Sequence, residues 1–551
     1  MNTTNQNPLE LWGGVECTIN RVGDRYSSQL TRNRHRTRLS DLDRFAELGL
    51  RTLRFPILWD ELGDDSLGGK AWRQVDAQLE RMRELGMRPI AGLIHHGSGP
   101  RETSLIDPRF PEKLAAFARR VAERYPWIDA YTPVNEPLTT ARFSGLYGHW
   151  YPHGRDGFTF VRALLNQLRG VVLSMRAIRA VNPRAALVQT DDLGKTFSSP
   201  KLQYQADFEN ERRWLSWDLL CGRLNRTHPM WSYLLSLGAD ERDIEFFGEN
   251  PCPPQVIGVN HYVTSERYLD ENLRDHPQET HGGNGRDRYA DVAAVRARLE
   301  GIAGPETLLR ETCTRYNMPV AVTEAHLGCT REEQLRWLHE IWHAAHKLRS
   351  EGQKVCAVTA WSLLGAFDWN SLLTRDDGHY ETGAFDLRGG TPRPTAVAKM
   401  IQSLAHAGTF EHPVLQTRGW WRRSVRLVPP LAARSRESRH LRVVSDERLD
   451  VAAQPLLILN PREPIADALI RVAELRGLPC VANEFDSTQP WAVIDCADIE
   501  RLNFVNRRTQ RQLLVRPGQL LTPLSENDST RNALRRIARG EEVLAANDRR
   551  I

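Results

Sequence analysis

The sequence lacks several features that define whole classes of protein. Its eight cysteines are scattered, without a C-x-x-C pair or a histidine cluster at zinc-finger spacing. Neither a disulfide framework nor a structural zinc site is therefore predicted, and we expect the cysteines to be reduced and mostly buried. No apolar run approaches the roughly 18 residues that span a bilayer. The N-terminus has no basic segment followed by an apolar one, so no secretory signal is expected and a cytoplasmic location is the default.

Charge is nearly balanced over the whole chain. The 74 lysines and arginines exceed the 69 aspartates and glutamates by only five, which does not indicate a nucleic-acid-binding or membrane-surface protein. One dense basic stretch, Arg418 to Arg442, holds eight arginines and a single acidic residue, Glu437. It is open to two interpretations: a nucleic-acid or membrane patch, or a solvated linker whose tryptophan pair docks on a domain. We favour the linker and predict neither a nucleic-acid nor a membrane partner.

The length indicates more than one domain, because 551 residues are too many for one ordinary hydrophobic core. We predict a large domain over residues 1–406, an Arg- and Pro-rich linker over 407–452 and a small domain over 453–551. In the small domain, PLLILN, IADALIRVAELRG, LPCVAN and WAVIDCA are typical of a strand, a helix and two further strands. That order opens a Rossmann-type α/β domain, which is here truncated.

Eight short apolar runs recur through the large domain, separated by stretches of helical period. One such stretch is LSDLDRFAELG, with Leu39, Leu42, Phe45 and Leu48 on one stripe, and another is EEQLRWLHEIWHAAHKL. The runs are nearly continuous in apolar residues, as strands covered on both faces must be: LELWGGVE, LRTLRFPIL, RPIAGLIHH, DAYTPVNE, AALVQTDD, QVIGVNHY, PVAVTEA and CAVTAWSLL. This alternation predicts a (β/α)8 TIM barrel, an α/β fold, followed by the small Rossmann-like domain.

Polar residues concentrate where the predicted strands end. In a TIM barrel the chemistry lies at the C-terminal ends of the strands, which meet on one face. The residues found there are Glu16, Arg54, His95, Asn135, Glu136, Asn260, Tyr262, Glu324 and Trp361. We therefore expect these side chains to gather in one site.

Two of these residues, Glu136 and Glu324, follow the fourth and seventh strands. Hydrolysis of a glycosidic bond with retention needs two carboxyl groups about 5 to 5.5 Å apart, one to protonate the leaving oxygen and one to attack the anomeric carbon. Strand ends on opposite sides of a barrel mouth can supply that spacing. Each glutamate alone would be interpreted as a surface carboxylate, but the pair favours a catalytic function.

At these residues the sequence resembles glycoside hydrolase family 1, the retaining β-glucosidase family. TPVNEP is similar to the family's T-x-N-E-P acid/base motif, and AVTEAH to its I/V-T-E-N-G nucleophile motif. LWGGVECTIN, LRFPILW, LIHHG, GVNHYVTS and WSLLGAFDW resemble further motifs in the family's order. The resemblance covers about residues 8–405 and implies a (β/α)8 barrel that hydrolyses β-glycosides through a covalent intermediate.

The resemblance also implies roles for the strand-end residues. Glu136 would be the acid/base and Glu324 the nucleophile, which Arg54 and Tyr262 would hold ionised. The resemblance further implies a set of substrate-binding residues, in which Asn135 takes the sugar 2-hydroxyl, His95 the 3-hydroxyl and Trp361 the floor under the ring: Asn20, His95, His96, Asn135, Asn260, Trp361, Asp368 and Trp369. No metal or other cofactor is expected.

Several positions depart from the family's pattern. The family has Gln where Asn20 stands, Trp where His96 stands and Glu where Asp368 stands, and these positions grip the 3-, 4- and 6-hydroxyls of the terminal sugar. It also has Asn-Gly after the nucleophile, where Ala325 and His326 stand here. The catalytic pair is kept while the sugar clamp is altered. We therefore predict a terminal sugar other than simple glucose: a deoxy or substituted hexose, or a longer glycan.

The small domain resembles a dTDP-4-dehydrorhamnose reductase that has lost its cofactor motifs. The expected G-x-x-G-x-x-G turn carries Asn460, Glu463 and Ala466 instead of glycines, and no tyrosine or lysine follows Lys399 to supply a Y-x-x-x-K pair. We predict a degenerate remnant that binds no nicotinamide cofactor and serves packing or assembly, including assembly of a homo-oligomer.

The leading hypothesis for the whole chain is thus a retaining β-glycosidase acting on a carbohydrate substrate. The alternative is a catalytically idle sugar-binding or scaffold protein built on the same barrel.

Overall fold

The structure is a computed structural model of the chain. It describes residues 8–63, 69–423 and 426, and within the C-terminal region 456–460, 466, 469–470, 480–482, 492–496, 502–506 and 511–515. The chain divides into two compact units, Met1–Trp421 and Arg422–Ile551. Each unit is described by itself.

The first unit is built on a closed barrel of eight parallel strands, in the order β1-β14-β13-β9-β7-β6-β5-β4. The strands are β1 (Glu10–Gly14), β4 (Thr52–Pro56), β5 (Arg88–Gly92), β6 (Ala130–Thr132), β7 (Ala186–Asp192), β9 (Val256–Asn260), β13 (Val320–Ala325) and β14 (Val355–Ala360). Each overlaps one of the eight predicted runs, and β14 begins one residue before its run. The predicted α/β barrel is confirmed.

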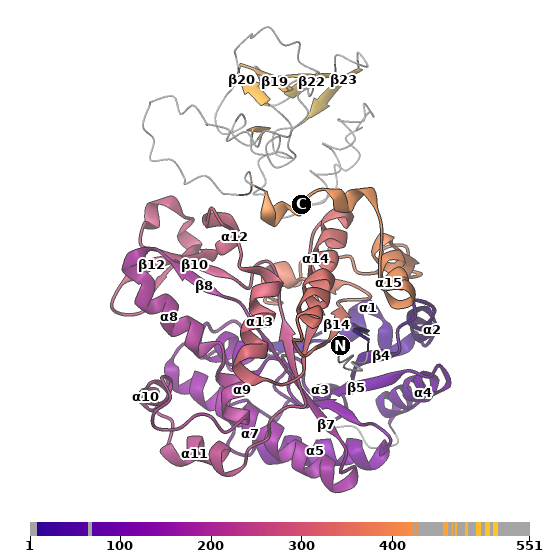
Figure 1. Ribbon diagram of the computed structural model, residues 1–551, viewed down its shortest axis with the longest axis vertical. Helices are drawn as coiled ribbons and strands as arrows, with labels where there is room; N and C mark the ends of the chain where they lie inside the picture. Colours follow the sequence, from indigo (N-terminus) through magenta and orange to yellow (C-terminus); the bar gives the residue numbers. More distant parts are fainter. Residues whose placement is uncertain are drawn as a thin grey trace. The chain divides into compact units, whose positions relative to one another are not determined.

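Helices surround the barrel strands (Figure 1). The longer ones are α2 (Ser40–Glu47), α4 (Lys70–Glu84), α5 (Phe110–Arg124), α7 (Gly157–Val181), α8 (Gln203–Arg212), α11 (Glu241–Glu249), α13 (Gly304–Tyr316), α14 (Arg331–Ser350) and α15 (Ala396–Ala407). Shorter ones are α1 (Gln29–Asn33), α3 (Trp59–Leu62), α6 (Pro137–Ala141), α9 (Leu215–Leu220), α10 (Trp231–Ser236) and α12 (Ala294–Ala297). The helices predicted over LSDLDRFAELG and EEQLRWLHEIWHAAHKL are α2 and α14. Leu39 is the exception on its predicted stripe, because it caps α2 and is 41% exposed.

Apolar packing explains why these strands close into a barrel. Every residue of β13 is buried. Trp12, Ile90, Val188, Ala321 and Ala357, from five strands, form a small cluster separate from the main core. Because the main core packs the other strand faces against the helices, this cluster lies inside the barrel.

One glycine of β1 has a direct effect on the barrel mouth. A Cβ atom on Gly14 would lie 2.5 Å from the Trp361 ring, so only glycine lets this indole lie against the strand. Gly14 of β1 thereby determines where the Trp361 ring, which follows β14, can lie.

Smaller sheets lie in the connections. A four-stranded sheet has the order β11-β12-β10-β8, made of β8 (Thr196–Ser198), β10 (Arg267–Asp270), β11 (His281–Gly283) and β12 (Arg288–Ala293). Two-stranded pairs join β2 (Ile19–Val22) to β3 (Arg25–Ser28), β15 (Ala366–Phe367) to β16 (Tyr380–Glu381), and β17 (Phe385–Asp386) to β18 (Arg393–Pro394). The sequence analysis predicted none of these short strands.

The first unit extends beyond its predicted end at residue 406. Trp421 is 1% exposed, and its ring meets Trp337 of α14 edge-on at 5.1 Å. Its indole N–H donates to Glu340 Oε2 at 2.7 Å. A tryptophan buried in this way holds residues 407–421 on the barrel. The sequence analysis expected a tryptophan pair here that docks on a domain. Residues 427–452 of the predicted linker lie outside the described residues.

The second unit contains a five-stranded sheet in the order β20-β19-β21-β22-β23. Its strands are β19 (Leu456–Leu459), β20 (Cys480–Ala482), β21 (Ala492–Asp495), β22 (Leu502–Asn506) and β23 (Arg511–Val515). The first three run parallel and fall in predicted strands, whereas β22 and β23 are antiparallel. Asn460, in the place of the first turn glycine, has a φ of 47°, and Glu463 lies outside the described residues. A Rossmann origin stays a prediction.

Of the eight cysteines, four are buried and four are half-buried. Among the described helices, none is both long and apolar enough to cross a bilayer.

Candidate active site

Glu324, in β13, has partners on both carboxylate oxygens. The Arg54 guanidinium on β4 donates to Oε1 at 2.7 Å, and the Tyr262 hydroxyl donates to Oε2. Arg54 also donates to the carbonyl of Thr323 at 2.8 Å, which fixes its position relative to the strand. Glu324 is 2% exposed. A cation and a hydroxyl donor both favour the ionised form of a carboxylate.

Glu136 is held in a contrasting environment. It lies between β6 and α6 with φ 47° and ψ 60°, a left-handed conformation that is uncommon for a residue with a side chain. The Asn260 amide donates to its Oε1 at 2.6 Å. Burial above all, and then the charge of Glu324, raise the pKa of Glu136 well above its ordinary value. The surroundings of Glu136 therefore favour the protonated form of its carboxyl.

Asn135 connects these two groups through its amide oxygen. Arg54 Nη2 and the Thr190 hydroxyl donate to Asn135 Oδ1 at 2.6 and 2.7 Å. The Asn260 amide also donates to this oxygen, at 3.4 Å. Because the oxygen is taken by three donors, the amide nitrogen must point the other way, toward His95 Nε2 at 3.3 Å and His96 Nε2 at 3.4 Å. Asn135 thus presents a donor toward the two histidines.

His95 and His96 are neutral imidazoles. Burial lowers the pKa of His95 well below its ordinary value and lowers the pKa of His96 to about 3. The His95 ring stacks on Trp361, with ring centres 5.5 Å apart and planes 6° from parallel. His96 Nδ1 lies 3.0 Å from the Thr140 hydroxyl, and its Nε2 lies 3.8 Å from Glu136 Oε2. Neutral ring nitrogens of this kind either donate to or accept from hydroxyl groups.

Trp369, Asp368 and Asn20 differ in their surroundings. Trp369 lies edge-on to His96 at 5.6 Å, and its indole N–H is buried without a hydrogen-bond partner. Asp368 is 1% exposed and engaged with protein groups: Arg32 donates to Oδ2, and the His379 backbone N–H donates to Oδ1 at 2.7 Å. Asn20 is fully buried, and neither atom of its amide has a partner.

The predicted residues are thus brought together to different degrees. Hydrogen bonds or ring contacts connect ten of them: Arg54, His95, His96, Asn135, Glu136, Asn260, Tyr262, Glu324, Trp361 and Trp369. Within the described part of the chain, no hydrogen bond joins the side chains of Asn20 or Asp368 to this group. The role of each residue stays a prediction at this stage.

The sequence analysis missed several neighbours of the site. Asp191 and Asp192 end β7, and their charges contribute to the raised pKa of Glu136. Thr190, in the same strand, donates to Asn135. A search for polar residues at every strand end would have found all three. Arg32, on α1, had no such signal, because it meets Asp368 across 336 residues of sequence.

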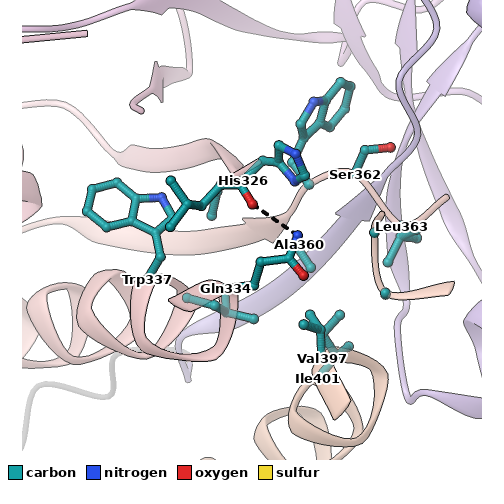
Figure 2. Close-up of a pocket in the computed structure, with 14 residues that line it drawn as sticks. His326, Gln334, Trp337, Ala360, Ser362, Leu363, Val397 and Ile401 are labelled. Atoms are coloured by element: carbon teal, nitrogen blue, oxygen red, sulfur yellow. Dashed lines mark hydrogen bonds between the residues drawn. The ribbon is translucent and has the colours of Figure 1, made fainter. Parts of the chain in front are cut away.

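A small cavity lies beside the end of β13, at the inner side of α14 and α15 (Figure 2). His326, Gln334, Trp337 and Trp361 are among its lining residues. At about 20 Å³ it has room for roughly one water molecule. It is too small for a sugar and is part of the packing behind Trp361. Among the described residues, no three His, Cys, Asp or Glu side chains are grouped so that they could hold a metal ion.

Comparison with known proteins finds β-glucosidases that are similar to this chain. No protein-family model matches the sequence. The chain is 20% identical over 455 residues to Beta-glucosidase 47 of Arabidopsis thaliana, covering 76% of this chain and 83% of that protein. Among solved structures, it is similar to a β-glucosidase from Thermotoga maritima in complex with cyclophellitol, with a TM-score of 0.59, 15% identity and coverage of 73% of this chain and 98% of that one.

A second structure, described as a family 1 β-glucosidase from Thermotoga maritima, gives a TM-score of 0.58 at 15% identity and covers 74% of this chain and 99% of that one. At these identities the likeness shows the fold. The first unit of this chain therefore has the α/β-barrel fold of β-glucosidases.

Proposed function

We propose that the chain is a retaining β-glycosidase that acts by double displacement. The observation that carries this proposal is the contrast between the two carboxyl groups. Glu324 is paired with a guanidinium and a phenol hydroxyl, whereas Glu136 is buried and its pKa is raised well above the ordinary value. A charged nucleophile beside a protonated acid is the arrangement that glycoside hydrolysis with retention requires.

In the first step, Glu324 attacks the anomeric carbon. The bond from this carbon to the glycosidic oxygen breaks as Glu136 gives its proton to that oxygen, so the aglycone leaves as a neutral alcohol. The sugar is then held on Glu324 as an ester, and Glu136 is left ionised. Loss of the Glu324 charge removes one cause of the raised pKa of Glu136, which suits its return to the ionised form.

In the second step, Glu136 acts as a base. It takes a proton from a water molecule, whose oxygen attacks the anomeric carbon and displaces the Glu324 carboxylate. The sugar leaves with its original β configuration, and both glutamates return to their starting states. Atoms and charge balance over the two steps, and the whole reaction consumes one water molecule.

The surrounding groups are suited to hold a sugar ring in this reaction. The Asn135 amide nitrogen is oriented as a donor and would reach the 2-hydroxyl, where contacts strengthen in the oxocarbenium-like transition state. The neutral His95 ring would bind a second hydroxyl. Trp361, stacked on His95, would form an apolar floor. The unpartnered amide of Asn20 and indole N–H of Trp369 would meet further hydroxyls.

Hydrolysis of aryl β-glycosides of several sugars tests this proposal. Wild type should release the aglycone and give the β-anomer first, as seen by NMR. Glu136→Gln and Glu324→Gln should each lose roughly a thousandfold or more, because acid and nucleophile act as a unit. Glu136→Ala should be rescued by azide on substrates with good leaving groups.

Glu10→Gln is the matched control, because Glu10 begins β1 at the opposite end of the barrel from the site. It should keep full activity. No turnover of any glycoside by wild type would favour the alternative, an idle sugar-binding protein.

A further inference from the structure

Glu16 is a buried carboxyl that the proposed mechanism does not use. It follows β1 and is 3% exposed, and its backbone N–H donates to the Ser362 hydroxyl at 2.8 Å. Thr18 donates to Glu16 Oε1 twice, from its backbone N–H at 2.9 Å and from its hydroxyl at 2.6 Å. Among the described residues, none donates a hydrogen bond to the second oxygen, Oε2. Glu16 Oε2 is not among the fully buried side-chain atoms that lack a partner, so water or a ligand can reach it.

Glu16 lies at the same end of the barrel as Glu324, because it follows β1 and its backbone N–H donates to Ser362, the residue after Trp361. Burial above all, and then the charge of Glu324, raise the pKa of Glu16 to about 7, while the Thr18 hydrogen bonds and the His326 imidazole oppose the rise. The charge of Glu16 in turn contributes to the raised pKa of Tyr262. The Glu16 carboxyl is therefore close enough to Glu324 and Tyr262 for their charges to influence one another.

Positive charge is scarce around these carboxyl groups. Arg54 is engaged by Glu324 and Asn135, and the imidazoles of His95 and His96 are neutral, since burial lowers the pKa of each ring. No described arginine or lysine forms an ion pair with Glu16.

The other cations nearby have carboxylates of their own. Arg32 is paired with Asp368 and Asp376. His326, the titratable group that faces Glu16, lies 3.0 Å from Glu381. The pocket therefore contains an acidic group for which the protein supplies no full positive charge.

A second unpartnered group lies four residues further along the chain. Asn20 is fully buried, and neither its amide nitrogen nor its amide oxygen has a hydrogen-bond partner. Buried polar atoms without partners cost free energy unless a ligand satisfies them. A ligand that satisfies both Glu16 Oε2 and the Asn20 amide must donate and accept hydrogen bonds. Its donor must be strong enough to bind a carboxylate.

We propose that the terminal sugar of the substrate carries a protonated amino group, which donates to Glu16 Oε2. The proposal rests on the proposed function, and it names an amino sugar as the substrate class. The folded protein already bears the cost of burying Glu16, so an ammonium group gains a charge-assisted hydrogen bond at a prepared acceptor. An anionic sugar is disfavoured, because its charge would face Glu16 and Glu324 without a free cation.

Binding of non-hydrolysable sugars to the full-length chain tests this proposal. The probes are β-thioglucosides with a hydroxyl at every position or with one amino group at carbon 2, 3, 4 or 6, measured by calorimetry near neutral pH. At least one amino sugar should bind about tenfold or more tightly than the hydroxyl parent, as a charge-assisted hydrogen bond predicts. If none of the four binds more tightly than the parent, the proposal is wrong.

Two variants locate the effect. Glu16→Gln keeps the size of the side chain and an oxygen for Thr18, and it should remove the preference for the amino sugar over the parent. Glu10→Gln, at the opposite end of β1, should change neither affinity. An amino preference that survives in Glu16→Gln overturns the assignment to this residue.

If Glu16→Gln does not fold, the binding measurements on wild type alone show whether the preference for an amino sugar exists. Because binding needs no turnover, a preference without hydrolysis would contradict only the proposed function, and hydrolysis without a preference would contradict only the amino-sugar class.

Discussion

Arg32 and Asp368 form an ion pair between α1 and the segment that follows β15. The Arg32 guanidinium donates to Asp368 Oδ2, while the His379 backbone N–H donates to Oδ1 at 2.7 Å. Both oxygens of this carboxylate are thus held by the protein. We predicted from sequence that the sugar clamp is altered at Asp368, where the family has glutamate. The structure gives a second reason for a weakened sugar clamp, since the carboxylate is already bonded to the protein.

Asp368→Asn should lower the free energy of unfolding by about 1 to 3 kcal/mol, because it leaves a largely buried guanidinium with a weaker acceptor. Asp376→Asn is the matched control, since it removes the other carboxylate of the same arginine, 64% exposed, and should cost at most about 1 kcal/mol. Chemical denaturation of the full-length variants measures both. Equal losses would show that burial of Asp368 does not decide the strength of its pairing.

Tyr262→Phe should reduce kcat/KM about 10- to 100-fold. It removes the hydroxyl that donates to Glu324 Oε2 and leaves the ring in place, and hydrogen bonds to charged groups contribute about 1.5 to 3 kcal/mol. Tyr268→Phe, in β10, changes a tyrosine of the neighbouring small sheet and should have no effect. Steady-state hydrolysis of an aryl glycoside compares the two, and equal rates in wild type and Tyr262→Phe would contradict a role in holding the nucleophile.

Asn260→Ala should move the basic limb of the pH profile of kcat/KM to higher pH. The acid must be protonated, so activity falls as pH rises through the pKa of Glu136. Burial and the charge of Glu324 raise that pKa, and the Asn260 hydrogen bond lowers it. Removing this bond therefore raises the pKa further. A basic limb that stays in place or moves to lower pH would contradict the assignment of Glu136 as the acid.

Glu16→Gln should make the protein relatively more stable above neutral pH. The pKa of Glu16 is raised by burial from 4.5 to about 7 in the folded chain, so the fold favours the protonated form. This contribution to stability is complete below pH 4.5 and is lost as pH rises through about 7. A shift of this size corresponds to about 3 kcal/mol.

Glutamine does not titrate, so Glu16→Gln does not lose this stability as pH rises. The free energy of unfolding of wild type and of Glu16→Gln is measured at both ends of this pH range. The difference between the two proteins isolates the contribution of Glu16, because contributions from other titrating groups cancel. A difference between the two proteins that does not change with pH would show that Glu16 titrates normally.

The barrel could be predicted because each strand is recognised from its own short stretch of sequence. Strands covered on both faces must be apolar throughout, and the polar residues Glu136 and Glu324 interrupt that pattern where strands end. Parallel strands bring such ends to one face, so the site followed from the fold. The seven resembling motifs added expected roles, which stay predictions.

Contacts between distant segments were not predictable in the same way. The pairing of Arg32 with Asp368 joins a short helix to a loop far along the chain. Asn260 was expected to bind substrate, yet its amide donates to Glu136, since only β7 separates β9 from β6 in the barrel. The burial of Trp421 against α14 placed the end of the first unit later than the change in composition suggested.

The most direct test of the catalytic pair is to trap the glycosyl group on the protein. Wild type would be incubated with 2-deoxy-2-fluoro β-glycosides that carry a dinitrophenyl leaving group, including amino sugars, and then digested for mass spectrometry. The account predicts one sugar per chain, attached to Glu324 and absent in Glu324→Gln. Attachment to another residue, or hydrolysis of the parent glycosides with no trapped sugar and with inverted product, would contradict it.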